Sequence, residues 1–170
     1  MRFFSTAWPA RPAHFRDAWE AYYEAMVKLS ENLMNFFAAA LRVDPAYFAS
    51  RIDRHLSALR GLNYPALDSE PQPGQLRAGA HSDYGTLTIL LPGPGDGGLD
   101  MMQLWTNDGW VSTLHRVAVP NRGDVWKRTG KIRQSMAFFH QPNWDAEIST
   151  LPHCISAEHP QQYEPVTAGP

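Results

Sequence analysis

The sequence predicts an α+β fold, because a helical amino-terminal part is followed by a part made of short β-rich runs. From His14 to Ala40, apolar residues recur at steps of three and four, which is the spacing of an amphipathic helix. After Leu59, short runs rich in β-branched and aromatic residues alternate with clusters of Pro, Gly, Asp and Asn. With 170 residues, 44% of them hydrophobic, the chain has the size of one domain and can supply a core.

Two helices are expected in the first part. The apolar spacing from His14 to Ala40 predicts one long amphipathic helix. Asp44 and Pro45 then provide a cap and a proline suited to the first helical position, which predicts a short helix to about Ile52. We expect both helices to lie against one face or end of a mostly antiparallel β-structure.

The second part contains runs that we expect to be strands. They are LRGLNYPAL, HSDYGTLTILL, WVSTLHRVAV and RQSMAFF. The run from His81 to Leu91 is interpreted as one continuous strand. The segment DMMQLWTND, which begins at Asp100, is interpreted as the end of a further strand.

Charge and composition narrow the functional classes. The chain has 15 basic and 17 acidic residues, and its net charge of -2 provides no electrostatic footprint for nucleic acid or an anionic membrane. No apolar run approaches membrane-spanning length. Cys154 is the only cysteine, which excludes an intramolecular disulfide and fits a reducing compartment. We therefore expect a cytoplasmic protein with a small-molecule partner, whereas its oligomeric state is not predicted.

Three polar residues in the β-rich part suggest a metal site. His81 and Asp83 stand two positions apart in the predicted strand, so their side chains are expected to share a face. His115 lies in a second β-run. Two histidines and one carboxylate form the facial triad that suits non-haem Fe(II) and leaves positions open for substrate, water and O2. Each residue alone is more often structural, and it is their order on successive β-runs that favours the metal site.

A second polar group lies in RQSMAFF. Arg133 and Ser135 should share one strand face, where a planar guanidinium and a hydroxyl suit a carboxylate. The alternative is a solvated or ion-paired arginine, which is the common role of arginine on a strand. His140 has the opposite parity and is expected to face away from this pair as a structural residue.

Three motif blocks resemble a known family. GAHSDYGTLTILL, LWTNDGWVSTLHRV and RQSMAFFHQPNWDAEI are similar to the Fe(II)- and 2-oxoglutarate-dependent dioxygenases of the isopenicillin N synthase-like superfamily. The resemblance implies a double-stranded β-helix, or jelly roll, with the long helix packed against it. It implies one oxygenase domain over residues 1–170, with a helical part at about 12–55 and a β-helix part at about 56–170.

The resemblance also implies roles for single residues. His81, Asp83 and His115 match the iron ligands of the family. Arg133 and Ser135 match the pair that binds the distal carboxylate of 2-oxoglutarate, and Tyr64 in GLNYP matches a tyrosine that touches this co-substrate, although less closely.

The implied reaction uses O2 and 2-oxoglutarate to oxidise a small organic molecule, with release of succinate and CO2. Two alternatives remain open. One is an iron oxidase of the same fold that needs no 2-oxoglutarate, and the other is a truncated, catalytically silent scaffold. The sequence does not identify the substrate or the outcome of the oxidation.

The sequence also departs from the family pattern. GGLDMMQLWTND joins two blocks at Leu99 and Asp100 that the family separates by further strands, so the β-helix core is expected to be incomplete. A shortened chain and a sequence with residues missing at this join are both open, and we favour the second. The segment NRGDVWKRTGKI reads as a mobile loop or a solvated connection. Four aromatic residues near the motifs are candidates to line the cavity or to fill the core: Tyr84, Trp105, Phe138 and Phe139.

Overall fold

A computed structural model describes residues 7–65, 72, 74–91, 100–118 and 133–169. The helices and strands follow one another along the chain as α1 Phe15–Ala40, α2 Pro45–Ile52, β1 Ala58–Tyr64, β2 Leu76–His81, β3 Leu87–Leu91, α3 Asp100–Trp105, β4 His115–Ala118, β5 Arg133–His140, β6 Glu147–Ile148, a short 3-10 helix Pro152–Cys154 and β7 Val166–Thr167. The observed structure is therefore of the predicted α+β class.

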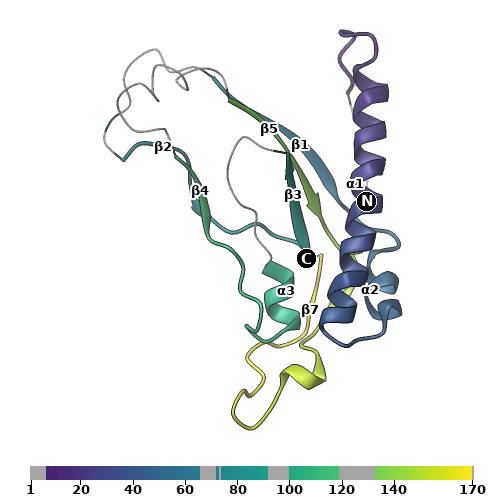
Figure 1. The fold of residues 1–170 in the computed structure, drawn as a ribbon, viewed down its shortest axis with the longest axis vertical. Coiled ribbons are helices and arrows are strands. Elements are labelled where there is room, and N and C mark those ends of the chain that lie inside the picture. The colour runs from purple at the N-terminus through teal and green to yellow at the C-terminus, as the bar shows by residue number, and fades with distance from the viewer. Residues whose placement is uncertain (1–6, 66–71, 73, 92–99, 119–132, 170) are drawn as a thin grey trace.

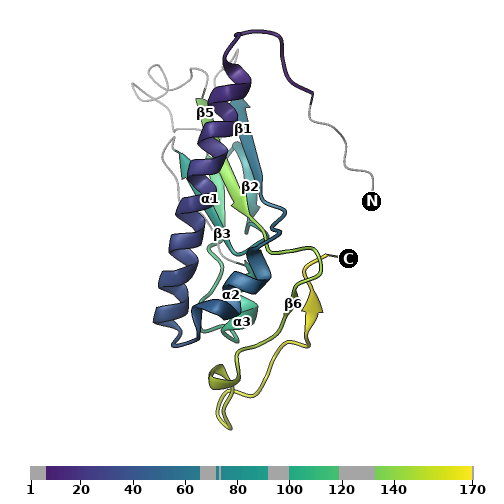
Figure 2. The ribbon, with the colours of Figure 1, turned by 90° about the vertical axis from the view of Figure 1, so that its right-hand side faces the viewer.

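Five of the described strands form two layers with a helix outside one of them, and β6 pairs with β7 in a separate two-stranded sheet. In the first layer the strand order is β1-β5-β3, and in the second β2 pairs with β4. All of these pairings are antiparallel. Helix α1 runs along the outer face of the first layer, and the β2-β4 pair lies on the opposite face of that layer (Figure 1). After a turn of 90°, α1 lies in front of the first layer (Figure 2).

The two amino-terminal helices confirm the predictions from apolar spacing and capping. Helix α1 begins at Phe15 and ends at Ala40, where the apolar pattern ends. Asp44 accepts a hydrogen bond from the Ala46 amide at 2.9 Å, and Pro45 occupies the first turn of α2. Within the described residues, no helix is long and apolar enough to cross a membrane.

A hydrophobic core lies between α2, α3 and the end of α1. Met34 and Ala38 of α1 are buried there with Phe48 of α2 and Trp105 of α3. The rings of Phe48 and Trp105 meet edge to face at 5.0 Å between centroids. Ile148 of β6 also belongs to this core.

The segment that begins at Asp100 is helical, so its prediction as a strand end was wrong. Residues Asp100–Trp105 form α3. Good helix formers dominate this stretch, and Asn107 and Asp108 adopt positive φ values that end the helix. The Asp108 amide donates to the carbonyl of Gln103 at 3.0 Å, which satisfies one carbonyl of the last turn.

The run from His81 to Leu91 is also not one strand. Strand β2 ends at His81 and β3 begins at Leu87, in the other layer. The chain turns at Gly85, whose φ of 107° is accessible to glycine. The run that contains His115 forms a strand only from His115 to Ala118, and the residues before it are irregular.

Two further expectations fall outside the described residues. Residues 92–99 contain the GGL block on one side of the join at Leu99 and Asp100, and residues 121–132 are the basic NRGDVWKRTGKI segment. The predicted gap in the core and the predicted mobile loop therefore stay predictions.

His140 faces away from the space between the two layers, as its parity predicted. Its ring is fully buried, lies 5.6 Å from the ring of His55, and is hydrogen-bonded through Nδ1 to the Thr86 hydroxyl. Among the described residues, no hydrogen-bond partner meets its Nε2. Burial, and then the neighbouring His55, lower the pKa of His140 from 6.5 to about 4.

Acidification is therefore expected to destabilise the chain through His140. Between pH 6.5 and about 4 the unfolded chain binds a proton that folded His140 does not, so unfolding becomes more favourable as the pH falls. The contribution is fully present above pH 6.5, and its loss should reduce the free energy of unfolding by about 3 kcal/mol. Urea unfolding at pH 7 and pH 4 measures this difference.

Two phenylalanine variants identify the residue responsible. His140→Phe should flatten the pH dependence of the free energy of unfolding, because it removes the imidazole that titrates. The Thr86 hydroxyl can keep its hydrogen bond to the carbonyl of residue 140, at 3.1 Å in the wild type, because that carbonyl belongs to the backbone. His14→Phe, at an exposed position, should leave the dependence unchanged. Equal pH dependence in wild type and His140→Phe would show that the acid sensitivity arises elsewhere.

Candidate metal centre

Two strands of the second layer bring His81 and His115 together. His81 is the last residue of β2 and His115 is the first of β4, and they are direct partners in the antiparallel register. Directly opposed residues have neighbouring side chains. The ring centroids are 4.3 Å apart. The register shifts between Ala78 and His81, an irregularity of the kind that re-aims side chains near functional sites.

Asp83 reaches the histidines from the segment between β2 and β3, not from a strand. The turn that carries it is fixed to the end of β5. The Thr86 amide donates to the carbonyl of His140 at 2.9 Å, and Gln141 Nε2 donates to the carbonyl of Tyr84 at 3.0 Å. The prediction that His81 and Asp83 lie close together is therefore correct, but the assumption that both belong to one strand is wrong.

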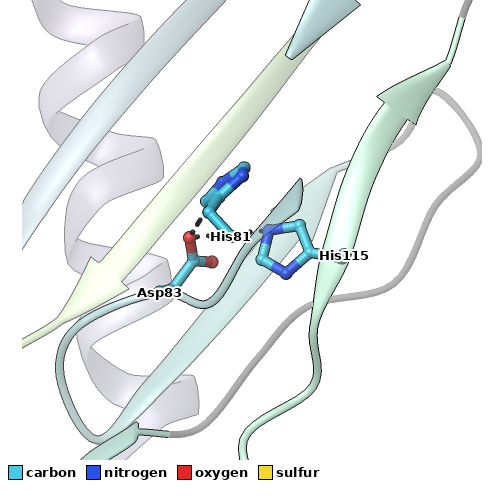
Figure 3. A group of neighbouring side chains, drawn as sticks. All are labelled: His81, Asp83 and His115. Carbon is cyan, nitrogen blue, oxygen red and sulfur yellow. Dashed lines mark ion pairs between the residues drawn. The ribbon is translucent and has the colours of Figure 1, made fainter. Parts of the chain in front are cut away.

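The three side chains converge on one point (Figure 3). Asp83 Oδ1 lies 3.6 Å from His81 Nε2 and 3.6 Å from His115 Nε2. One ligand atom from each residue lies within 4.8 Å of the others. The Asp83 side chain is 9% exposed and that of His81 is 47% exposed, so the cluster has a buried side and an open side.

Hydrogen bonds orient both imidazoles. His81 Nδ1 lies 2.8 Å from the carbonyl of Gly79, and His115 Nδ1 lies 3.0 Å from the carbonyl of Thr113. A carbonyl only accepts, so each Nδ1 carries a proton, which leaves Nε2 as the atom that would bind a metal. Metal-binding histidines typically donate their other ring N–H to a backbone carbonyl in this way.

The donor set fits a divalent metal. Asp83 Oδ1 belongs to a buried side chain, and neither Nε2 forms a hydrogen bond with it, since 3.6 Å is too long. Two imidazole nitrogens and one carboxylate oxygen around a common point can share one cation, and this donor set suits non-haem Fe(II).

Gly85→Ala is expected to disrupt this arrangement more than its distance from the metal ligands suggests. A Cβ at this position would lie 2.5 Å from the carbonyl oxygen of His140, and the φ of 107° disfavours an L-residue. The turn must shift and carry Asp83 with it. We expect a loss of about 1–3 kcal/mol in unfolding free energy together with weaker binding of Mn(II).

Thermal unfolding and Mn(II) titration of the same protein measure both effects. Gly74→Ala is the matched control, because Gly74 also has a positive φ but a Cβ there meets nothing within 4 Å. It should lose stability without losing metal affinity. Wild-type Mn(II) affinity in Gly85→Ala would disconnect the turn from the site.

A cleft between the two layers surrounds the cluster. Ser135 is buried on β5 and lines this cleft, and so does Tyr64 of β1. Arg133 is the direct register partner of Tyr64, but its side chain lies outside the described part of the chain. The cleft is lined by Leu62, Tyr64, His81, Asp83, Thr88, Leu90, His115, Val117, Ser135, Ala137 and Phe139.

The four aromatic candidates have different locations. Phe139 lines the cleft. Trp105 and Phe138 are fully buried and outside the cleft lining, and Tyr84 is 82% exposed. Core packing was therefore the correct alternative for Trp105 and Phe138.

Of two residues that the sequence did not single out, one lines the cleft and the other contacts a lining residue. Thr88 lines it, and its buried hydroxyl has no hydrogen-bond partner among the described residues. Arg77 of β2 contacts Tyr64, a lining residue. A parity argument along TLTILL could have placed Thr88 on the face of Leu90. No sequence signal distinguishes Arg77 from a solvated arginine.

Comparison with known proteins agrees with these features. The sequence profile of the 2OG-Fe(II) oxygenase superfamily matches residues 57–142. The chain is 28% identical over 177 residues to a 2-oxoglutarate-dependent dioxygenase from Aspergillus rugulosus, which covers 88% of this chain and 54% of that protein. It is 32% identical to validamycin A dioxygenase from Streptomyces hygroscopicus subsp. limoneus. This alignment of 171 residues covers 85% of this chain and 46% of that protein. The chain thus spans about half the length of these relatives.

Solved structures extend the similarity to the fold. A full-length protein of Neurospora crassa, solved in complex with alpha-KG, superposes with a TM-score of 0.80 at 30% identity, over 95% of this chain and 58% of that one. A 2OG-Fe(II) oxygenase family protein from Caulobacter crescentus gives 0.81 at 30% identity, over 96% and 59%. The predicted double-stranded β-helix fold is confirmed. Because the profile covers half of the chain and the fold agrees over nearly all of it, this chain belongs to the 2OG-Fe(II) oxygenase superfamily.

Proposed function

We propose that the chain is a non-haem Fe(II)- and 2-oxoglutarate-dependent oxygenase that oxidises a small organic substrate with O2 and releases succinate and CO2. The observation that carries the proposal is the convergence of His81, Asp83 and His115, with both Nδ1 atoms held by carbonyls and both Nε2 atoms turned toward the carboxylate. These three residues would hold the iron. The net charge of -2 favours a small molecule over nucleic acid as the substrate.

Other residues would bind the co-substrate. Arg133 and Ser135 on β5 would take the distal carboxylate of 2-oxoglutarate, and the buried Ser135 hydroxyl would add a hydrogen bond. Tyr64 lies beside Arg133 in the register and lines the same cleft. The roles of these three residues come from the family resemblance. The placement of Ser135 and Tyr64 in one cleft supports theirs, and the register position of Arg133 opposite Tyr64 supports its own.

The iron, when bound, would supply the activation of O2, one atom of which would enter succinate while the other would oxidise the substrate and end in the product or in water. The chain itself positions the reactants and limits water. Leu62, Leu90 and Val117 give the cleft an apolar wall, which weakens competition from solvent near the cluster. The exposed side of His81 leaves an approach for the substrate.

Succinate formation tests the proposal directly. The Fe(II)-loaded chain should convert 2-oxoglutarate to succinate and CO2 in air, and should form none without O2 or after His115→Ala. O2 consumption that needs iron but no 2-oxoglutarate would identify the iron oxidase instead. A folded chain that binds iron and yet consumes neither compound would identify the silent scaffold.

A further inference from the structure

A second cavity lies where α1, and the residues just before it, meet β1. Its volume is about 520 Å³, which is within the range of small-molecule pockets. It shares no lining residue with the metal cleft. Helix α1 covers one face of the first layer, whereas the β2-β4 pair, which carries His81, lies on the opposite face (Figure 1). The cavity is lined by Trp8, Trp19, Glu20, Tyr23, Glu24, Ala58 and Leu59.

Helix α1 presents two kinds of side chain to this cavity. Trp19 and Tyr23 are four positions apart, and so are Glu20 and Glu24, so the members of each pair lie one turn apart on the same side of the helix. Like charges at this spacing repel each other. A cation in the cavity would reduce this repulsion and would also meet the aromatic rings.

The aromatic walls are held in place by contacts with the first layer. The Trp19 ring lies against β1, where a Cβ at Gly61 would come within 3.3 Å of the ring. The Tyr23 hydroxyl donates to the carbonyl of Ser57 at 3.1 Å, and the Tyr23 ring meets Phe138 edge to face at 5.4 Å between centroids. These contacts order the rings before a ligand binds, which lowers the entropic cost of binding.

The charges around the cavity are only partly balanced. Arg16 Nε donates to Glu20 Oε1 at 2.8 Å, and the Arg16 guanidinium carbon lies 5.7 Å from the centroid of the Trp8 ring. A carboxylate and an indole that line the cavity therefore already hold one cation of the chain itself. Glu24 forms no ion pair with any residue that the structure describes. One negative charge of the lining is thus left over, which suits a singly charged ligand.

The composition of the lining also indicates the type of cation. A metal ion such as Ca²⁺ needs six or more oxygen ligands, which two glutamates among aromatic rings do not supply. A primary ammonium group is strongly hydrated and would lose this hydration against the rings. A quaternary ammonium group needs no hydrogen bonds and is bound by aromatic faces.

We propose that this cavity binds an organic cation with a quaternary ammonium head. Trp8, Trp19 and Tyr23 surround the methyl groups of this head, and Glu24 is its counter-ion. The site goes beyond the proposed oxygenase function, since it contains no metal ligand and no residue of the metal cleft.

Calorimetric titration of the full chain with choline, in the presence of a chelator, tests the site. The reference compound is 3,3-dimethylbutan-1-ol, in which a carbon atom replaces the charged nitrogen of choline. Choline should bind about 5- to 30-fold more tightly than this alcohol, the gain expected from a cation on partly desolvated aromatic faces. Ethanolamine, which has a primary ammonium group, should bind more weakly than choline.

Three variants test the residues of the site. Trp8→Leu and Glu24→Gln should each weaken choline binding by about 2- to 5-fold, because each removes one attraction at a partly exposed position. Glu164→Gln is the matched control, because it removes the same charge from an exposed glutamate outside the cavity lining. It should bind choline like wild type. Far-UV circular dichroism checks that every variant is folded.

Three results would overturn the proposal. Equal affinity for choline and the neutral alcohol would show that the cavity does not recognise charge. Tighter binding of ethanolamine than of choline would show that the aromatic rings do not select the ligand. Equal losses in Glu24→Gln and Glu164→Gln would show that choline responds only to the overall charge of the chain. Because the titration needs neither iron nor O2, its outcome is independent of succinate formation.

Discussion

Asp83→Ala is expected to lower the affinity of the chain for Fe(II) by more than about 100-fold and to leave the fold intact. Changes to residues that only orient metal ligands cost about 10- to 100-fold, and Asp83 is the single anionic member of the cluster itself. Its removal leaves two neutral imidazoles, which hold Fe(II) weakly. Anaerobic Fe(II) titration measures the loss.

The same variant should not be less stable than wild type without metal. Neither imidazole donates a hydrogen bond to the Asp83 carboxylate at 3.6 Å, so its removal breaks no hydrogen bond with them. A thermal unfolding experiment in chelator checks this expectation. Asp83→Glu should bind iron poorly but better than Ala, because the extra methylene misplaces the oxygen. Asp17→Ala, at an exposed helical position, is the control, and unchanged Fe(II) affinity in Asp83→Ala would remove Asp83 from the site.

Arg133→Ala is expected to weaken 2-oxoglutarate binding by about 30- to 1,000-fold with little change in iron affinity. A charge-assisted bidentate pair in a partly desolvated pocket is worth about 2–4 kcal/mol, which corresponds to that range. Arg133→Lys should recover only part of the loss, because an ammonium group cannot reproduce the planar fork. Titration of the Mn(II)-loaded chain with 2-oxoglutarate measures these affinities.

The neighbouring residue provides the control for this prediction. Gln134 is exposed, follows Arg133 in β5 and donates to Asn63 Oδ1 at 3.1 Å. Gln134→Ala therefore changes the same strand without reaching the cleft. Wild-type affinity for 2-oxoglutarate in Arg133→Ala would locate the distal-carboxylate site elsewhere.

The helices could be predicted from the sequence because their signals are local. Apolar spacing set the limits of α1, and the hydrogen bond from Ala46 to Asp44 follows from residues two positions apart. The same reasoning failed at α3, where short segments with apolar residues fit a strand and a helix equally. Asn107 and Asp108 have positive φ values after the end of α3, and the prediction did not consider them as a helix stop.

The residues of the metal-site cluster could be predicted from the sequence, but the backbone arrangement that brings them together could not. Residue types and their order along the chain selected His81, Asp83 and His115, whereas the register that pairs the two histidines joins residues far apart in the sequence. The turn at Gly85 carries the chain from one layer to the other, and a period-two pattern does not reveal such a crossing.

Arg77 shows the limit of sequence reasoning most clearly. In LRAGAH it has the appearance of an ordinary strand arginine. Its Nη1 donates to the carbonyl of Tyr64, 13 positions earlier and in the opposite layer, and its Nε and Nη2 are buried without a partner among the described residues. Such a contact depends on the packing of two sheets, which no local pattern encodes.

The location of the metal ion in the Mn(II)-loaded protein tests the proposed iron site most directly. Anomalous diffraction should place one ion between His81 Nε2, His115 Nε2 and an Asp83 carboxylate oxygen, at about 2.0–2.3 Å from each. An ion bound elsewhere, or one that lacks any of these three ligands, would contradict the facial triad and the oxygenase function that rests on it.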